Sequence, residues 1–189
     1  MNRLPFPLEF FAHEREVWFR DEQAEITRLT QGHTEIVRAV AEHIEEFYPK
    51  AYAALCEEYK GWRGNPLHFM FRIVCRFIRC NFAQLDNIPD ISTDSHCNFE
   101  FVSCPLRGEC RHDRIICRPK FNHHLSSAEL TVMRLFFDGL SKEAIGERLC
   151  LSPHTVHSHI RNSYLKLGVH SRAEFMAYAV KSSMFHEQI

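Results

Sequence analysis

The sequence contains no uninterrupted apolar stretch long enough to cross a membrane. Its longest apolar run, residues 67–82, is broken by three arginines, which are unfavourable in a bilayer core. The first sixteen residues, MNRLPFPLEFFAHERE, pass quickly from apolar to charged, so we expect no signal peptide. We therefore expect a cytoplasmic protein without membrane contact, whose eight cysteines are reduced and do not form disulfides.

Common catalytic motifs are also absent. The sequence has no G-x-S-x-G, no G-x-x-x-x-G-K-[ST] and no H-E-x-x-H. His123 and His124, near Cys117, suggest a Cys/His nucleophile pair, but a linker that leads into a helix explains these histidines more simply. We expect that the protein is not an enzyme.

The formal net charge of −1 gives no overall signature of nucleic-acid binding. The charge is distributed unevenly, because residues 1–96 carry 11 Lys and Arg against 15 Asp and Glu, a net charge of −4. Residues 97–124 have a net charge of +2 and residues 125–189 a net charge of +1. The slight basic excess in the second half is where a DNA-binding segment would be expected.

Residues 1–92 read as a helical sensor, dimerisation or partner-binding domain. Apolar residues between Thr34 and Pro49 recur at helical spacing, which predicts an amphipathic helix. We expect further helices over Asp21–Leu29, Ala51–Tyr59 and Pro66–Leu85. The region lacks the alternating strands and helices, and the phosphoacceptor aspartate, of a receiver domain.

Three arginines follow one face of the helix expected at Pro66–Leu85. Arg72, Arg76 and Arg79 recur at helical spacing along it. The row is either a binding patch for an anion or DNA backbone, or simply a solvated helix face.

Four of the eight cysteines fall within residues 93–124, which we interpret as a separate connector. Their spacing is Cys97-x6-Cys104-x5-Cys110-x6-Cys117, and the segment has β-prone runs at 99–102 and 114–116 that predict a small hairpin. Such a hairpin has little core, so a tetrahedral Zn²⁺ ion bound by these cysteines, or by three of them and a histidine, would stabilise it. No C-x2-C pair is present, and an iron–sulfur cluster, a redox thiol switch or buried reduced thiols remain alternatives.

Residues 125–189 contain four helix-sized segments, each preceded by a serine that is suited to cap a helix: Ser126, Ser141, Ser152 and Ser171. Glu129 and Glu174 complete two capping boxes, and Gly139 and Gly168 are placed to end helices. Only three residues, 150–152, separate the second helix from the third. Two helices joined by so short a turn form a helix-turn-helix, whose second helix enters the major groove of DNA.

This region resembles the C-terminal domain of LuxR-type transcription regulators. The matching residues are Gly139-Leu140-Ser141, Ile145, Glu147-Arg148-Leu149, Ser152, Thr155-Val156, His159, Asn162, Tyr164, Lys166-Leu167-Gly168-Val169 and Ser171-Arg172. The resemblance implies that Pro153–Leu167 is the recognition helix and that the fourth helix, Ser171–Val180, mediates dimerisation. The positions that face bases in this family are His157, Ser158 and Arg161 here. Those that hold phosphates are Thr155, His159 and Lys166.

The recognition helix departs from this pattern in two ways. His154 and His157 stand where the family commonly has lysines, and histidine is mostly neutral at pH 7 because its unperturbed pKa is near ~6.5. Ser163 occupies a position that is usually apolar. Arg161 and Lys166 alone form a thin basic surface, so we expect weaker electrostatic binding than the family usually has.

The sequence therefore predicts a mainly α protein with an N-terminal helical domain, a cysteine-rich β-hairpin connector and a C-terminal four-helix LuxR-like domain. We expect a bacterial, sequence-specific regulator of transcription that binds double-stranded DNA as a homodimer. One alternative is a protein-interaction module that docks on RNA polymerase or another regulator. A second alternative is a regulator that senses a metal or redox state through Cys97–Cys117.

Overall fold

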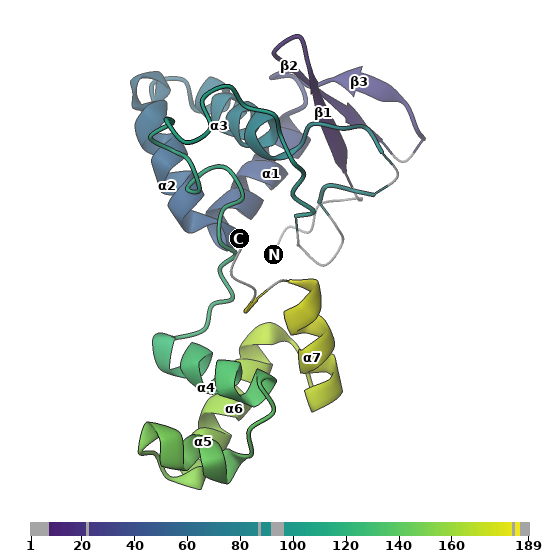
Figure 1. The fold of residues 1–189 in the computed structure, drawn as a ribbon. Helices are drawn as coiled ribbons and strands as arrows, with labels where there is room; N and C mark the ends of the chain where they lie inside the picture. The colour runs from purple at the N-terminus through teal and green to yellow at the C-terminus, as the bar shows by residue number, and fades with distance from the viewer. Residues whose placement is uncertain (1–7, 22, 87, 92–96, 183, 186–189) are drawn as a thin grey trace. The chain divides into compact units, whose positions relative to one another are not determined.

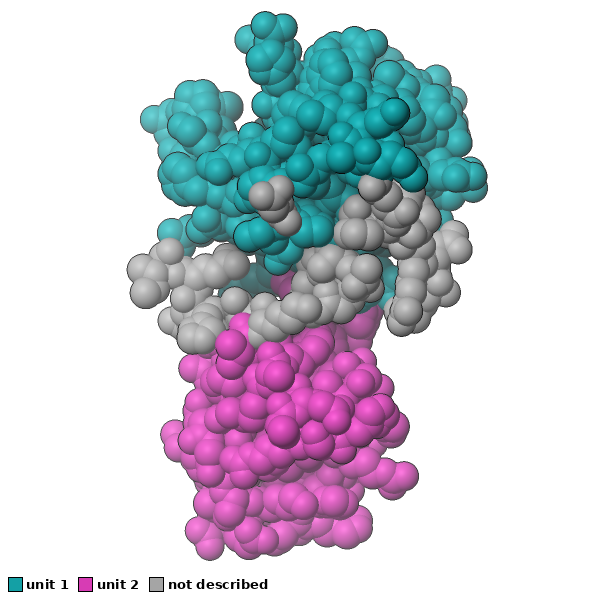
Figure 2. Space-filling view, turned by 90° about the vertical axis from the view of Figure 1, so that its right-hand side faces the viewer, with its two compact units in different colours: residues 1–120 teal, residues 121–189 magenta. Residues whose placement is uncertain are grey.

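The computed structural model describes residues 8–21, 23–86, 88–91, 97–182 and 184–185. The chain divides into two compact units, residues 1–120 and residues 121–189 (Figure 2). No helix in the described part of the chain combines the length and apolar content that a membrane crossing requires.

Unit 1 begins with a three-stranded antiparallel sheet that the sequence analysis did not predict (Figure 1). The strands are β1 (Glu9–His13), β2 (Glu16–Arg20) and β3 (Ile26–Arg28), with Phe10 opposite Phe19 in the pairing of β1 and β2. The prediction of a helical N-terminal domain is therefore confirmed for the residues that follow the sheet, but it missed the sheet itself. The strands form because buried Phe10, Val17 and Phe19 point to one face, and their neighbours along the strands point to the other.

The helix predicted at Asp21–Leu29 was also wrong, and a turn explains the difference. The Asp21 carboxylate accepts hydrogen bonds from the backbone N–H groups of Gln23 and Glu25, both at 2.9 Å. Such a local side-chain acceptor favours a turn over a helix. The chain then returns along β2 as the short strand β3.

Four helical elements follow the sheet: α1 (Thr34–Phe47), α2 (Pro49–Glu58), a 3₁₀ turn η1 (Lys60–Trp62) and α3 (Pro66–Asn81). The amphipathic helix predicted after Thr34 is confirmed by α1, which buries Val37, Val40 and Ile44. Helix α3 is the central element, because it packs against α1, α2 and the first two strands (Figure 1). It ends at Asn81, four residues earlier than the sequence predicted.

Aromatic rings join these elements into one core. Phe82, just after α3, stacks on Phe10 of β1 and on Phe99, with ring centroids 6.4 Å and 6.0 Å apart. Tyr48 and Phe77 contact Phe99 from α1 and α3, at 5.3 Å and 6.1 Å. Aromatic pairs at these separations add to the stability that ring burial provides. Phe99 therefore brings the cysteine-rich segment into the core of unit 1.

The β-hairpin predicted in the cysteine-rich segment was wrong: apart from an isolated bridge between Cys97 and Ile91, residues 97–120 consist of turns, bends and irregular chain. The backbone hydrogen bonds of this segment go to other partners. Glu100 donates its N–H to the Asn81 carbonyl at 2.9 Å, and its carboxylate accepts from Ala83 and Gln84 at the end of α3. In the second β-prone run, residues 114–116, Ile116 donates its N–H to the His112 carbonyl at 3.0 Å. This bond forms a turn and not a strand.

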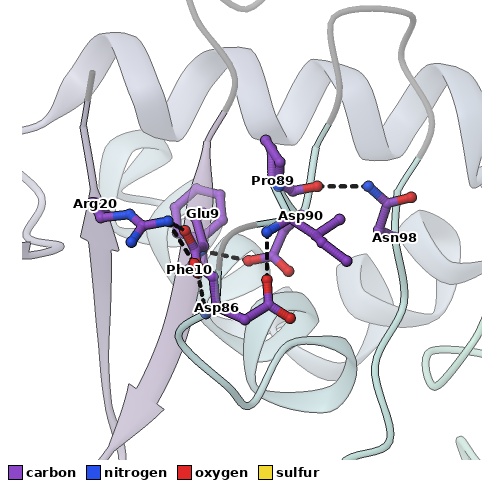
Figure 3. Close-up of polar contacts among 8 residues, drawn as sticks. Glu9, Phe10, Arg20, Asp86, Pro89, Asp90 and Asn98 are labelled. Carbon is purple, nitrogen blue, oxygen red and sulfur yellow. Dashed lines mark hydrogen bonds and ion pairs between the residues drawn. The ribbon is translucent and has the colours of Figure 1, made fainter. Parts of the chain in front are cut away.

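Buried carboxylates lie where β1 meets the segment after α3 (Figure 3). Asp90 is 1% exposed and accepts a hydrogen bond of 2.5 Å from the Phe10 N–H. Glu9, 4% exposed, pairs with Arg20 and accepts from the Asp86 N–H. Burial raises the pKa of Asp90 to about 8, the Phe10 N–H opposes this rise, and the nearby carboxylates of Glu100, Glu9 and Asp86 add to it.

We predict that Asp90→Asn makes the stability of unit 1 less dependent on pH. The pKa of Asp90 is raised in the folded state, so its contribution is complete below its ordinary pKa of 3.8 and is lost as pH rises through about 8. The wild-type free energy of unfolding should fall by up to ~1.4 kcal/mol per pH unit between pH 5 and pH 8. Asparagine cannot ionise, and its amide oxygen still accepts from Phe10.

Urea unfolding followed by tryptophan fluorescence measures this effect in unit 1, which contains both tryptophans, Trp18 and Trp62. The matched control is Asp138→Asn, at an exposed carboxylate in unit 2. Equal pH slopes in the wild type and Asp90→Asn would contradict the prediction.

Candidate nucleic-acid interface

Unit 2 consists of four helices: α4 (Ser127–Phe137), α5 (Lys142–Leu149), α6 (Pro153–Leu167) and α7 (Arg172–Lys181). The four predicted serine caps are all confirmed. The side chains of Ser126, Ser141, Ser152 and Ser171 accept hydrogen bonds from backbone N–H groups three residues later, at 3.2, 3.2, 3.0 and 3.1 Å. These serines fix the first turns because they pair N–H groups that would otherwise lack acceptors.

One apolar core holds the four helices together. Its buried residues are Val132, Met133, Phe136, Ile145, Val156, Ile160, Val169, Phe175 and Ala179. Phe175 of α7 is fully buried, and its ring lies 6.0 Å from that of Phe136 and 6.1 Å from that of Tyr164. The core includes the face of α6 that carries Val156 and Ile160 and leaves the opposite face of this helix exposed.

The turn between α5 and α6 depends on Gly146. Cys150 ends α5 in the left-handed conformation, with φ of 54°, and Leu151 then donates its N–H to the Gly146 carbonyl at 2.8 Å. A Cβ atom at position 146 would lie 2.6 Å from the Leu151 carbonyl oxygen. At this glycine the close approach is therefore to the backbone of the turn.

The exposed face of α6 carries His157 and Arg161, while Ser158 and His159 are half-buried. The Ser158 hydroxyl donates to the His154 carbonyl at 3.0 Å. The Thr155 hydroxyl lies 2.8 Å from that of Ser152 at the helix start. Thus the predicted base-facing and phosphate-facing positions all lie along one helix, five of them between Thr155 and Arg161 and the sixth, Lys166, near its end.

Two basic residues that the sequence analysis did not assign join this face. The Lys142 ammonium, at the start of α5, lies 3.1 Å from His157 Nδ1. The Arg172 guanidinium, at the start of α7, lies over the Phe136 ring, 4.7 Å from its centroid. Both residues line a groove of about 440 Å³ beside α6, together with Arg161, and no carboxylate in the described part of the chain lines it. Because Lys142 and Arg172 lie outside α6 in the sequence, their grouping with Arg161 could not be predicted from helical spacing.

Lys166, a predicted phosphate ligand, is held by a carboxylate within unit 2. Its ammonium lies 2.6 Å from Glu129, which is 5% exposed and belongs to the capping box of α4. Burial opposes ionisation of Glu129, but the hydrogen bonds from Lys166 and Ser126 outweigh burial and lower its pKa. A phosphate contact by Lys166 stays a prediction, and it would compete with this ion pair.

Ser163, the polar residue at a usually apolar position, is fully buried in α6. Its hydroxyl donates to the His159 carbonyl at 2.8 Å. A buried hydroxyl with a partner inside its own helix costs little, so this departure from the family pattern is compatible with the fold.

The cysteines predicted as zinc ligands lie in two places within unit 1. The Cys97 sulfur lies 3.5 Å from His43 Nε2, and burial raises the pKa of Cys97 to about 12. Cys117 shares a hydrogen bond with Cys80 of α3. This bond lowers the pKa of Cys117 to about 7 and, with burial, raises that of Cys80. Among the described residues, no three Cys, His, Asp or Glu side chains converge as a metal site.

Unit 2 is similar to a known family of bacterial regulatory proteins. The family described as bacterial regulatory proteins, luxR family, matches residues 123–179. The Fimbriae Z protein of Salmonella typhimurium strain LT2 is 44% identical over 64 residues, covering 32% of this chain and 30% of that protein. DegU of Brevibacillus brevis, a transcriptional regulatory protein, is 35% identical over 60 residues, 32% of this chain and 25% of DegU.

A Mycobacterium bovis protein described as a putative HTH-type transcriptional regulator is 40% identical over 57 residues, 30% of this chain but 6% of its own length. The chain thus spans less than a third of the length of each of these relatives. No solved structure matches the chain.

We predict that Gly146→Ala destabilises unit 2, because the new methyl group meets the Leu151 carbonyl. Overpacking of this kind costs ~1–3 kcal/mol, and the better helix propensity of alanine offsets up to ~1 kcal/mol of it. The measurement is the thermal unfolding of unit 2 by far-ultraviolet circular dichroism. Gly64→Ala is the control, since nothing lies within 4 Å of its added Cβ. Unfolding of unit 2 at or above the wild-type temperature would show that the turn adapts to alanine.

Proposed function

Because residues 123–179 form a helix-turn-helix domain of the luxR family of bacterial regulatory proteins, we propose that this protein is a transcription regulator that binds double-stranded DNA. Helix α6 enters the major groove and reads the base sequence. The observation that carries the proposal is the basic groove along α6, lined by Lys142, Arg161 and Arg172 and, among the residues that the structure describes, by no carboxylate. A chain of net charge −1 has no general attraction for DNA, so this local grouping supplies the attraction.

Each basic residue has a separate role in this proposal. Arg161 is exposed midway along α6, where its guanidinium reaches the N7 and O6 acceptors of a guanine. Lys142 begins α5, the first helix of the pair, and Arg172 begins α7, so both contact phosphates beside the groove. His157, next to Lys142, contacts a base edge, and the N-terminus of α6 adds backbone N–H donors for a phosphate.

We further propose that the protein acts in the bacterial cytoplasm as a homodimer that binds a two-fold symmetric site. A dimer doubles the number of phosphate contacts, which compensates for the few lysines on α6. Helix α7 is the proposed contact, and its Val180 side chain is 58% exposed although it is apolar.

We predict that Arg161→Ala weakens binding to the preferred DNA site by ~1–3 kcal/mol and relaxes the sequence preference at one base pair. The site is first selected from a random double-stranded library, and affinity is then measured by fluorescence anisotropy. Arg134→Ala is the matched control, because Arg134 lies on α4 outside the helix-turn-helix pair. Unchanged affinity and preference in Arg161→Ala would remove this residue from base reading.

We predict a different signature for Lys142→Ala. Loss of a phosphate contact weakens binding to all sequences alike and reduces the slope of log affinity against log salt by about 1. The same anisotropy titration at several salt concentrations measures this slope. Salt-independent binding by the wild type would favour the alternative that unit 2 docks on RNA polymerase or another protein.

The cysteine-rich segment remains a proposed zinc site, with Cys80 added to the candidate ligands. The contact between Cys80 and Cys117 adds Cys80 to the candidates Cys104, Cys110 and Cys117, although no three such groups converge among the described residues. Cys97, beside His43, is the less favoured fourth ligand. A bound ion would draw these thiolates together and stabilise a segment that has no regular secondary structure.

We predict about one zinc ion per chain in protein purified without oxygen and without a metal-binding tag, measured by elemental analysis. Zinc should be retained in Cys97→Ser and lost in Cys80→Ser. The reverse pattern would return Cys97 to the ligand set. Iron with matching sulfide would indicate a cluster, and absence of any metal would overturn metal binding.

A further inference from the structure

Unit 1 contains a cavity whose residues are distant in sequence from the proposed DNA-reading helix. Its volume is about 530 Å³, and it lies between strand β2, the residues that follow β3 and one face of α3. Its apolar lining includes Val17, Leu29 and Phe71. Both the volume and the mixed lining are typical of small-molecule sites.

Four arginines line this cavity: Arg15, Arg28, Arg72 and Arg79. Among the described residues, Glu16 is the single carboxylate in the lining, and it is engaged by Arg28 at 2.8 Å. The grouping is not a result of composition, because residues 1–96 have a net charge of −4. The cavity therefore has a strong positive charge within an acidic part of the chain.

Arg72 and Arg79 are held in place without being neutralised by a carboxylate. Arg79 donates from Nε to the Cys75 carbonyl and from Nη1 to the Arg15 carbonyl, both at 3.2 Å. The Arg72 guanidinium lies over the Tyr59 ring, 5.2 Å from its centroid, and its Nε is buried without a hydrogen-bond partner. Among the described residues, no carboxylate forms an ion pair with Arg15, Arg72 or Arg79.

We propose that this cavity binds a small organic anion, whose carboxylate or phosphate group is held by Arg72 and Arg79. A planar guanidinium offers paired N–H donors that match both of these groups. The apolar part of the ligand would pack on Val17, Leu29 and Phe71. This site is independent of the proposed DNA binding.

The cavity also explains the arginine row seen in the sequence. Arg72 and Arg79 line the cavity, whereas Arg76 does not line it and lies near Cys80. The three arginines therefore do not form one continuous surface along which a nucleic-acid backbone could bind. A concave site with an apolar floor favours a small ligand over a polyanion.

Isothermal titration calorimetry of the full chain with phenyl phosphate tests the proposal, and phenol is the uncharged control. We expect saturable one-to-one binding of phenyl phosphate and none of phenol. Arg72→Gln should weaken binding at least tenfold. Glu16→Gln should strengthen it severalfold, because it releases Arg28 from its ion pair, an effect that a purely structural role of these residues would not produce.

Arg38→Gln is the matched control, since Arg38 is an exposed arginine of α1 outside the cavity. If Arg72→Gln lowers the unfolding temperature, Arg15→Gln replaces it, because Arg15 lies exposed at the hairpin turn, and at least threefold weaker binding is expected. Absence of phenyl phosphate binding, or equal binding by the wild type, Arg15→Gln and Arg72→Gln, would overturn the proposal.

Discussion

The buried side chain of Asn81 holds the cysteine-rich segment to the rest of unit 1. Its amide donates to the Ile116 carbonyl at 2.9 Å and its oxygen accepts from the Arg118 N–H at 2.7 Å. Because Asn81 is fully buried, each of these groups would be costly to leave unpaired. One side chain at the end of α3 thus replaces the ladder of hydrogen bonds that the segment would have needed as a hairpin. The arrangement also brings Cys117 to Cys80.

The features that could be predicted from the sequence are those that neighbouring residues determine. Each serine cap of unit 2 and its N–H partner are three residues apart, and the amphipathic face of α1 repeats within four turns. At such short range, the chemistry of the side chains is enough to specify the conformation.

The sheet of unit 1 could not be read in the same way. Its hairpin turn is formed by Glu14 and Arg15, both with positive φ, where the usual signal is Asn-Gly. The inward residue Phe10 stacks on Phe82, a partner that no local pattern reveals. The alternation over Val17 and Phe19 was present in the sequence, but it was too short to stand out against the helices that follow.

The candidate site was predictable only where it follows α6. Thr155 to Arg161 are neighbours on one helix, so their common face follows from helical spacing. Lys142 and Arg172 come from the starts of α5 and α7, and packing alone brings them to the same groove. For this reason the charge of the whole chain, or even of its last third, understated the basic character of this surface.

The ion pair between Lys166 and Glu129 has a consequence for the way unit 2 unfolds. Glu129 accepts from the Ser126 N–H at the first turn of α4, and it pairs with Lys166 near the end of α6. The start of one helix is therefore bonded to the end of another through a single carboxylate. If either of these turns frays, the other loses its partner. The start of α4 and the end of α6 are therefore expected to open together as one cooperative unit.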